Sequence, residues 1–182
     1  MAMNNEQRQE KMDAFWARVH KAVGEDNGLR ATFRRNAGEL LQTADGRAVT
    51  AFYRVCVGVP ISKGDEDKCF FAICAACLWK PEEWPRAVSL MAGARILNPD
   101  ERGTLEKRLR VLLDLPWDDE GYFAAKLCRL LKYCRSKSLV IDGKSLMKDL
   151  TGWDSDKRFV QKRWVREFYR EDEKFESKGA DE

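Results

Sequence analysis

Three of the six cysteines have a spacing that is typical of metal ligands. Cys69, Cys74 and Cys77 form a C-x4-C-x2-C pattern, the spacing of the ligands in plant-type iron–sulfur proteins. The pattern lies within CFFAICAACLW (69–79), an apolar run of helical character without a glycine-rich loop to wrap a cluster. Buried thiols pack as small hydrophobic side chains, and disulfides are rare in a cytosolic chain of this size. We therefore expect reduced cysteines, no metal and no cofactor.

No other group of residues has the composition of a catalytic site. The single histidine, His20, lies beside the apolar face of the first predicted helix, without a Ser, Cys or carboxylate motif near it. Paired carboxylates and a phosphate-binding loop are also missing from the sequence. We expect that the protein is not an enzyme.

The stretch DKRFVQKRWVREFYR (156–170) mixes Lys and Arg with four aromatic residues. On a helix with about 100° per residue, Val160, Trp164 and Phe168 form one buried stripe. The cations on the other side are also spaced four apart: Arg158, Lys162, Arg166 and Arg170, with Arg163 at the edge. The segment is therefore predicted to be a helix with one apolar and one basic side.

Two aromatic residues, Phe159 and Tyr169, fall among the cations. A solvent-exposed helix would show this pattern if the aliphatic parts of its Lys and Arg side chains and its rings cover a neighbouring helix. A nucleic-acid-binding face would show it as well. Residues 126–170 contain 13 Lys or Arg against 5 Asp or Glu, whereas the whole chain carries only +3. This concentrated basic field favours a polyanionic partner, most simply a nucleic acid. An acidic protein, a membrane surface and a merely solvated face remain alternatives.

The elements that must position these residues are predicted to be helices. Apolar residues recur at helical spacing along the chain, and neither hairpin signals nor repeats occur. We expect an all-α fold of about nine helices, five before Asn98 and four after it, in two small helical bundles. The predicted bounds are 1–97 for the N-terminal bundle, 98–175 for the C-terminal bundle with the basic face, and 176–182 for an acidic disordered tail. The β-branched run 139–141 is expected to insert between helices.

Capping residues predict where several helices begin. Asp67 is expected to cap the apolar helix, and Pro85 to lie in the first turn of the helix that follows. Asp142 is expected to cap the penultimate helix, and Asp154 or Ser155 to cap the last one.

The sequence gives no sign of a membrane or of export. No apolar run approaches the roughly 18 residues that a membrane span needs. The first residues, MAMNNEQRQEK, lack the apolar stretch of a signal peptide. We expect a cytoplasmic protein.

Five segments in order resemble the CasB family, the small subunit of the type I-E CRISPR surveillance complex called Cascade. They are LRATFRRNAG (29–38), AFYR (51–54), KLCRLLKYCRSK (126–137), DGKSLMKDLTGWD (142–154) and QKRWVREFY (161–169). The Arg-Arg pair before Phe-Tyr-Arg and the basic terminal helix carry most of the resemblance, which covers residues 10–170.

The resemblance implies a non-catalytic, all-helical protein of two bundles. Two copies would lie head-to-tail beside the backbone subunits and help to stabilise the R-loop along the displaced DNA strand. The implied partners are the backbone and large subunits, a second copy, the R-loop of guide RNA and target DNA, and displaced single-stranded DNA, with no membrane. Carried over by position, the candidate nucleic-acid-binding residues are Arg34, Arg35, Arg54, Lys126, Arg129, Lys132, Arg135, Lys157, Arg158 and Lys162. The basic side of the last helix adds Arg163 and Arg166.

Two other classes of protein remain open. A free-standing helical nucleic-acid-binding regulator would carry the same charge, although no helix-turn-helix pair with a polar recognition helix is evident. A purely scaffolding subunit would use the basic face to dock acidic subunits. For the subunit that the resemblance implies, the Arg34–Arg35 cluster and the 126–170 region are expected to contribute to one continuous basic track that spans the junction of two copies packed head-to-tail.

Overall fold

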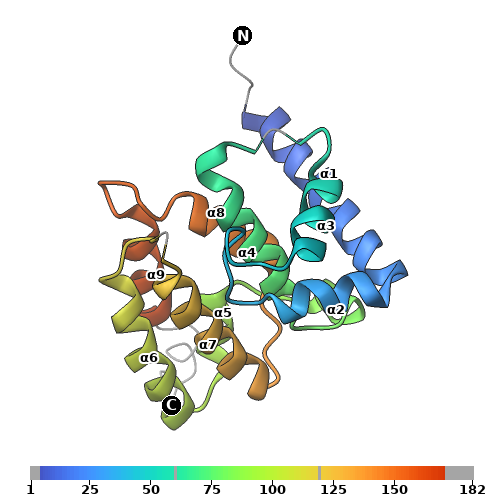
Figure 1. Ribbon diagram of the computed structural model, residues 1–182. Helices are drawn as coiled ribbons and strands as arrows, with labels where there is room; N and C mark the ends of the chain where they lie inside the picture. Colours follow the sequence, from blue (N-terminus) through green and yellow to red (C-terminus); the bar gives the residue numbers. More distant parts are fainter. Residues whose placement is uncertain (1–4, 60, 119, 171–182) are drawn as a thin grey trace, which may run out of the picture.

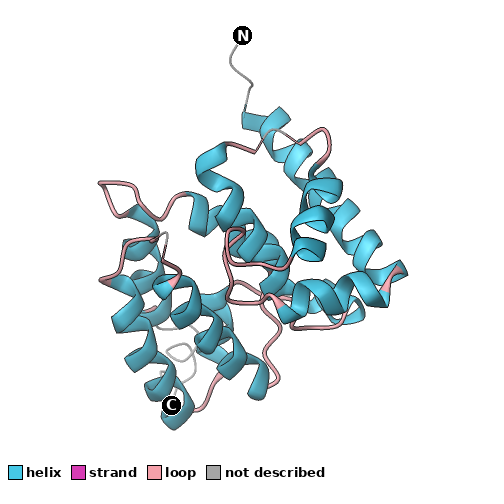
Figure 2. Ribbon diagram, in the orientation of Figure 1, coloured by secondary structure: helices cyan, strands magenta, loops and turns pink. Residues whose placement is uncertain are grey.

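The computed structural model describes residues 5–59, 61–118 and 120–170, and this part of the chain consists of helices joined by loops (Figures 1 and 2). Its α-helices are α1 (Asn5–Glu25), α2 (Asn27–Arg35), α3 (Gly46–Cys56), α4 (Glu66–Ala76), α5 (Leu90–Ile96), α6 (Pro99–Leu113), α7 (Tyr122–Ser136), α8 (Gly143–Thr151) and α9 (Phe159–Tyr169). Two 3-10 helices, η1 (Lys63–Asp65) and η2 (Pro81–Arg86), precede α4 and α5. The prediction of an all-α fold is confirmed.

Helices α4 and α8 pack together at the centre of the molecule. Figure 1 shows α1, α2 and α3 on one side of this pair, and α6, α7 and α9 on the other. The buried side chains form two clusters, one on each side. Helix α4 is apolar around its whole circumference, so Phe71 and Ala75 join one cluster while Phe70 and Cys74 join the other. The bounds at residues 97 and 175 remain predictions, and the predicted tail lies outside the described residues.

The connection into α8 is the one place in the described chain where two segments pair like strands. Val88 donates its backbone N–H to Val140, and Asp142 donates to Val88, at 3.0 and 2.9 Å. These bonds hold the β-branched run 139–141 in a buried position, as predicted. Asp142 then caps α8 through the N–H groups of Lys144 and Ser145, which confirms its predicted role.

The predicted start of the apolar helix is wrong. Helix α4 begins at Glu66, and its N-cap residue Asp65 makes no side-chain cap bond. Asp67 instead accepts a hydrogen bond of 2.7 Å from the backbone N–H of Leu41. Its carboxylate therefore ties α4 to the loop that follows α2.

The predicted start of the next helix is also wrong. Pro85 lies inside η2, and α5 begins at Leu90 with Ser89 as its N-cap. The residues between them must stay extended, because Val88 pairs with the 140–142 segment. An α-helix that started at Pro85 would break that pairing.

Neither predicted cap of the last helix is used. The residue before α9 is Arg158, in a left-handed conformation with φ of 48°. Asp154 is engaged elsewhere: its carboxylate accepts from the Lys68 ammonium at 2.8 Å and from the Trp117 backbone N–H at 3.0 Å. Ser155 takes part through its backbone: its N–H donates to the Gly152 carbonyl at 3.4 Å, and its carbonyl accepts from the Arg158 N–H at 2.8 Å.

Candidate nucleic-acid interface

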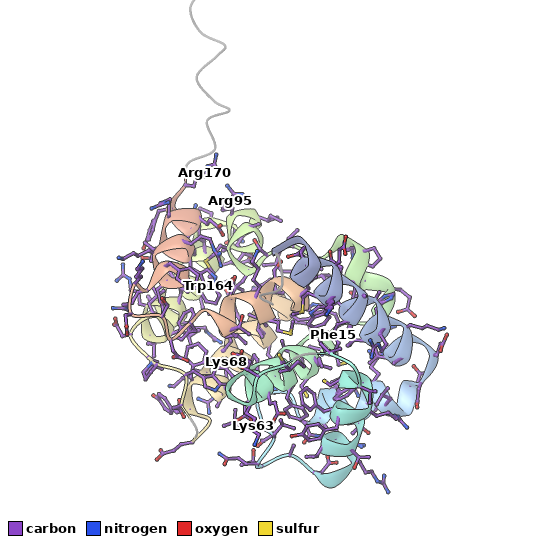
Figure 3. The ribbon with its side chains drawn as sticks, turned by 90° about the horizontal axis from the view of Figure 1, so that it is seen from above. Phe15, Lys63, Lys68, Arg95, Trp164 and Arg170 are labelled. Atoms are coloured by element: carbon purple, nitrogen blue, oxygen red, sulfur yellow. The ribbon has the colours of Figure 1, made fainter. Side chains whose placement is uncertain are left out.

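The apolar side of α9 packs into the core as the sequence predicts. Val160, Trp164 and Phe168 are at most 1% exposed, and Figure 3 shows Trp164 within the body of the molecule while Arg170 lies at its edge. The Trp164 ring stacks edgewise on Trp153 at a centroid distance of 5.0 Å. The buried stripe fixes which side of α9 faces solvent.

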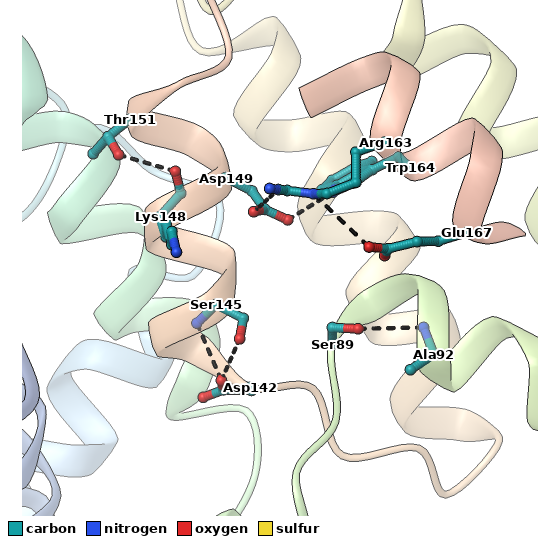
Figure 4. A network of polar contacts seen from close by, with 10 residues as sticks. All are labelled: Ser89, Ala92, Asp142, Ser145, Lys148, Asp149, Thr151, Arg163, Trp164 and Glu167. Atoms are coloured by element: carbon teal, nitrogen blue, oxygen red, sulfur yellow. Dashed lines mark hydrogen bonds and ion pairs between the residues drawn. The ribbon is translucent and has the colours of Figure 1, made fainter. Parts of the chain in front are cut away.

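A largely buried carboxylate anchors one edge of α9 (Figure 4). Asp149 of α8 accepts a hydrogen bond of 2.6 Å from the Trp164 indole N–H and a second bond from the Arg163 guanidinium. Burial raises the pKa of Asp149, although Trp164 and Arg163 oppose that shift. Arg163 also lies 3.9 Å from Glu167. Arg163, a predicted nucleic-acid contact, is therefore occupied by an internal ion pair.

Arg158 is also engaged within the fold. Its guanidinium donates to the Leu113 carbonyl at the end of α6 and lies 3.9 Å from the Asp114 carboxylate. Arg158 also has a left-handed backbone conformation. Its contact with the end of α6 therefore fixes the position at which the preceding turn leads into α9.

The remaining cations of this region have no hydrogen-bond or ion-pair partner within the part of the chain that the structure describes. Lys162, Arg166 and Arg170 are exposed, as is Lys157 in the turn before α9. Their side chains make no hydrogen bond or ion pair with any described residue. Between them, Phe159 is 49% exposed and Tyr169 is 52% exposed. The Tyr169 hydroxyl donates to Glu106 at 2.5 Å, so only the ring of that residue is open to solvent.

A second group of predicted cations lies on α7. Arg129, Lys132 and Arg135 are exposed, because the opposite face of the helix supplies the buried Leu127, Leu130 and Leu131, among others. Lys126 is half-buried and lies over the Tyr122 ring, with its ammonium 5.1 Å from the centroid. The outer face of α7 is thus cationic and includes one partly exposed ring.

The Arg34–Arg35 cluster ends α2. Arg34 is exposed, and Arg35 donates weakly to the Thr32 hydroxyl at 3.5 Å. Arg34 and Arg30 border one small surface hollow, which Asn27 and Ala31 complete. Arg30 is not among the nucleic-acid-binding residues predicted from the sequence. Its spacing of four residues from Arg34 nevertheless indicates that both lie on the same face of α2.

Residues that follow α2 pack directly on α7. The Cys128 thiol donates to the Ala37 carbonyl at 3.2 Å. Gly38 has φ of 102°, and an added Cβ there would lie 3.1 Å from the Cβ of Cys128, so the two segments touch closely. Figure 1 shows α2 running toward α7. The structure therefore brings the residues that follow α2 against α7 at Cys128.

Arg54 is not brought into this group. It lies in the last turn of α3 and is exposed. Helix α3 packs against α1 and α2, on the other side of α4 from α9 (Figure 1).

The cysteines line the core. Cys69, Cys74, Cys77, Cys128 and Cys134 are buried and Cys56 is half-buried, all as free thiols. Burial raises the pKa of Cys69 and Cys77 to about 12. Among the described residues, no group of three or more His, Cys, Asp or Glu could hold a metal ion. The His20 imidazole contacts the Pro81 carbonyl at 2.9 Å.

The fold and its exposed cations define an all-helical protein with a basic surface. Comparison with family models extends this description: the chain matches the family "CRISPR-associated protein Cse2" over residues 29–169. The chain therefore belongs to the Cse2 family, and the resemblance found in the sequence is confirmed.

Solved structures share the fold over most of this chain. A chain described as "CRISPR RNA-guided surveillance complex" is 26% identical, with a TM-score of 0.67 over 90% of this chain and 94% of that one. CasB from Thermus thermophilus is 23% identical, with a TM-score of 0.65 over 87% and 97%. CasB from Thermobifida fusca is 19% identical, with a TM-score of 0.59 over 87% and 96%.

The curated proteins contain no match to this chain. Within the described residues, no helix combines the length and the apolar character that crossing a membrane requires.

Proposed function

We propose that the protein is a non-catalytic subunit of a CRISPR RNA-guided surveillance complex that stabilises the R-loop by binding the displaced DNA strand. Its partners would be the backbone and large subunits, a second copy, and the nucleic acids of the R-loop. Family membership and the likeness to a chain of a surveillance complex support the assembly. The observation that carries the DNA-binding part is the set of exposed cations on α7 and α9.

The energetics of an R-loop suit such a surface. Replacing a DNA duplex by an RNA–DNA hybrid of similar length is close to balanced in free energy. Modest binding to the displaced strand therefore shifts the equilibrium toward the open state. Lys162 and Arg166 can neutralise phosphates without breaking an internal contact, whereas Arg158 and Arg163 would have to leave Leu113 and Asp149 first.

The contact between Ala37 and Cys128 supports a continuous basic track. It joins the end of α2, with Arg34, to the face of α7 that carries Arg129 and Lys132. A flexible strand that follows both helices would meet cations from both sides of the molecule, with no need for base recognition.

The test compares two charge reversals of equal size. The variant K162E/R166E changes the basic side of α9, and K11E/K21E makes the same change in net charge on α1. Binding to a labelled single-stranded oligothymidine of about 20 nucleotides is measured at several salt concentrations. We expect weaker binding for K162E/R166E only, with a salt slope shallower by up to about 0.7 for each phosphate that is no longer neutralised.

Three outcomes would decide between the classes of function. If K162E/R166E binds DNA like the parent, these cations are solvated surface and do not contact the strand. If the parent itself does not bind single-stranded DNA, the scaffolding function is favoured. Failure to co-purify with a guide-RNA complex, despite DNA binding, would favour a free-standing regulator.

A further inference from the structure

The outer side of α9 ends in a short row of free cations. Lys162 and Arg166 are spaced four apart on one side of α9, and Arg170 follows as the residue that ends the helix. All three are exposed, and none has a partner among the described residues. Figure 3 shows Arg170 at the outer end of this helix. An α-helix of this length spans about 16 Å, so the row is compact.

The next residues along the chain have the opposite charge. The segment EDEKFESKGADE (171–182) contains six Asp or Glu and two Lys, a net charge of −4. Its first three residues, Glu171, Asp172 and Glu173, are all acidic and follow Arg170 directly. Twelve residues can reach about 40 Å when extended, which exceeds the length of α9.

We propose that the acidic segment 171–182 competes with nucleic acid for the free cations of α9. The proposal rests on the proposed function, because the ligand that the segment opposes is the displaced DNA strand. The covalent link gives the carboxylates an effective concentration in the millimolar range at these cations. Lys162 and Arg166 lie within about 12 Å along the helix axis of the point where the segment begins, so its first residues can reach them.

Such competition would favour DNA that is already held beside the subunit over free DNA. DNA must displace the carboxylates before its phosphates reach Lys162 and Arg166, so free DNA binds more weakly than the cations alone would allow. A strand that is already held beside the subunit has a high local concentration and overcomes the competition. Salt weakens the pairs that the cations form with the carboxylates as well as those with DNA phosphates. The effect of the segment on DNA affinity therefore decreases as the salt concentration rises.

The principal test keeps the chain at full length and removes only charge. All six carboxylates are changed to amides: E171Q, D172N, E173Q, E176Q, D181N and E182Q. Binding to the same labelled oligothymidine is measured from about 50 to 200 mM salt. If three cations are released, the salt slope steepens by up to about 2, and the gain in affinity over the parent shrinks by up to about 16-fold across that fourfold range of salt. A variant with residues 171–182 in shuffled order should bind like the parent.

A second pair of variants identifies the cations involved. The amide substitutions are combined with K162Q/R166Q, which removes two of the three proposed partners. We expect the amide substitutions to tighten DNA binding much less in this background than in the parent. Equal tightening in both backgrounds would overturn the proposal, because it would show a general repulsion between DNA and the acidic charge.

The two proposals fail in different ways. If the amide substitutions leave DNA affinity unchanged while K162E/R166E still weakens binding, the competition is wrong and the proposed DNA-binding face stands. If K162E/R166E binds like the parent, the DNA-binding face itself is wrong, and the competition proposal falls with it.

Discussion

At the residue scale, the cations of α9 differ in what their side chains touch. Arg163 shares the largely buried carboxylate of Asp149 with Trp164, whereas the Lys162 side chain beside it makes no hydrogen bond or ion pair with a described residue. Removing a charged partner of a buried carboxylate costs about 1.5–3 kcal/mol, and surface substitutions usually stay within about 0.5 kcal/mol. We expect Arg163→Ala to lower the free energy of unfolding by the larger amount and Lys162→Ala by the smaller. Urea denaturation measures both.

The pairing itself can be checked in a background without the Asp149 charge. In the Asp149→Asn variant the side-chain carbonyl can still accept from the Trp164 indole, but Arg163 loses its ion pair with position 149 and keeps only the longer one with Glu167. Arg163→Ala should then cost less than it does in the parent. An unchanged cost would show that Arg163 stabilises the fold through another contact.

The buried thiols have a reactivity that follows from their surroundings. Burial raises the pKa of Cys69, Cys77 and Cys134 to about 12, so at pH 8 each has roughly a thousandfold less thiolate than a free thiol. We expect slow alkylation of the native protein by iodoacetamide and rapid alkylation of all six cysteines after unfolding, as measured by mass spectrometry. Rapid native labelling of Cys69 or Cys77 would contradict their placement in the core.

The same shifts predict a loss of stability in alkaline solution. Thiols of the unfolded chain ionise at about pH 8.5, whereas those with a raised pKa in the folded state stay protonated up to about 12. Between these values the folded state binds more protons, so its stability falls as the pH rises. Below the lower value the thiols are neutral in both states and contribute nothing to the pH dependence.

At the scale of elements, the approach of α8 to α4 depends on a glycine. A Cβ at Gly143 would lie 2.7 Å from the Cβ of Ala76 and 2.9 Å from the Trp16 ring, so α8 would have to move away from α4. We expect Gly143→Ala to destabilise the protein by about 1–3 kcal/mol, as overpacked cores do. The measurement is thermal or urea unfolding.

Gly103 offers a matched control for this substitution. It lies inside α6, and an added Cβ would meet no atom within 4 Å. Gly103→Ala should therefore stabilise the protein by about 0.5–1 kcal/mol through helix propensity. If both substitutions destabilise equally, the close contact at Gly143 is not the cause.

Elements with one apolar face were predictable from the sequence. The inward positions of α6 and α7, such as Leu105, Leu109 and Leu127, follow from spacing alone, because a helix exposes the same face every three to four residues. The starts of α4 and α9 were not predictable in this way. Asp67 and Asp154 are good capping residues in isolation, but their carboxylates bind Leu41 and Lys68, which lie far away in the sequence.

Prediction from the sequence meets the same limit at the basic side of α9. Periodicity correctly separates the buried Val160–Trp164–Phe168 stripe from the cations, but it treats all the cations alike. Only the folded chain shows that Arg163 is held by a carboxylate 14 residues away. A sequence therefore predicts which side of α9 is basic, and the tertiary contacts decide which of its charges are free.

At the scale of the whole molecule, both buried clusters depend on α4. Because one helix completes both cores, we expect the chain to unfold in a single cooperative transition. Phe33→Ala in one cluster and Leu130→Ala in the other should each lower the melting temperature of that same transition, at a cost of about 2–5 kcal/mol. Differential scanning calorimetry measures it, and two separate transitions in either variant would contradict the shared core.

The shared helix also determines how far the cations of α2 lie from those of α7. Because α4 belongs to both cores, α2 and α7 do not move relative to each other as separate domains would. The distance between their charges is therefore set when the chain folds. A surface pre-organised in this way loses little conformational entropy on association. On the proposed DNA-binding face, a flexible strand would then adapt to distances between cations that the folded protein has already fixed.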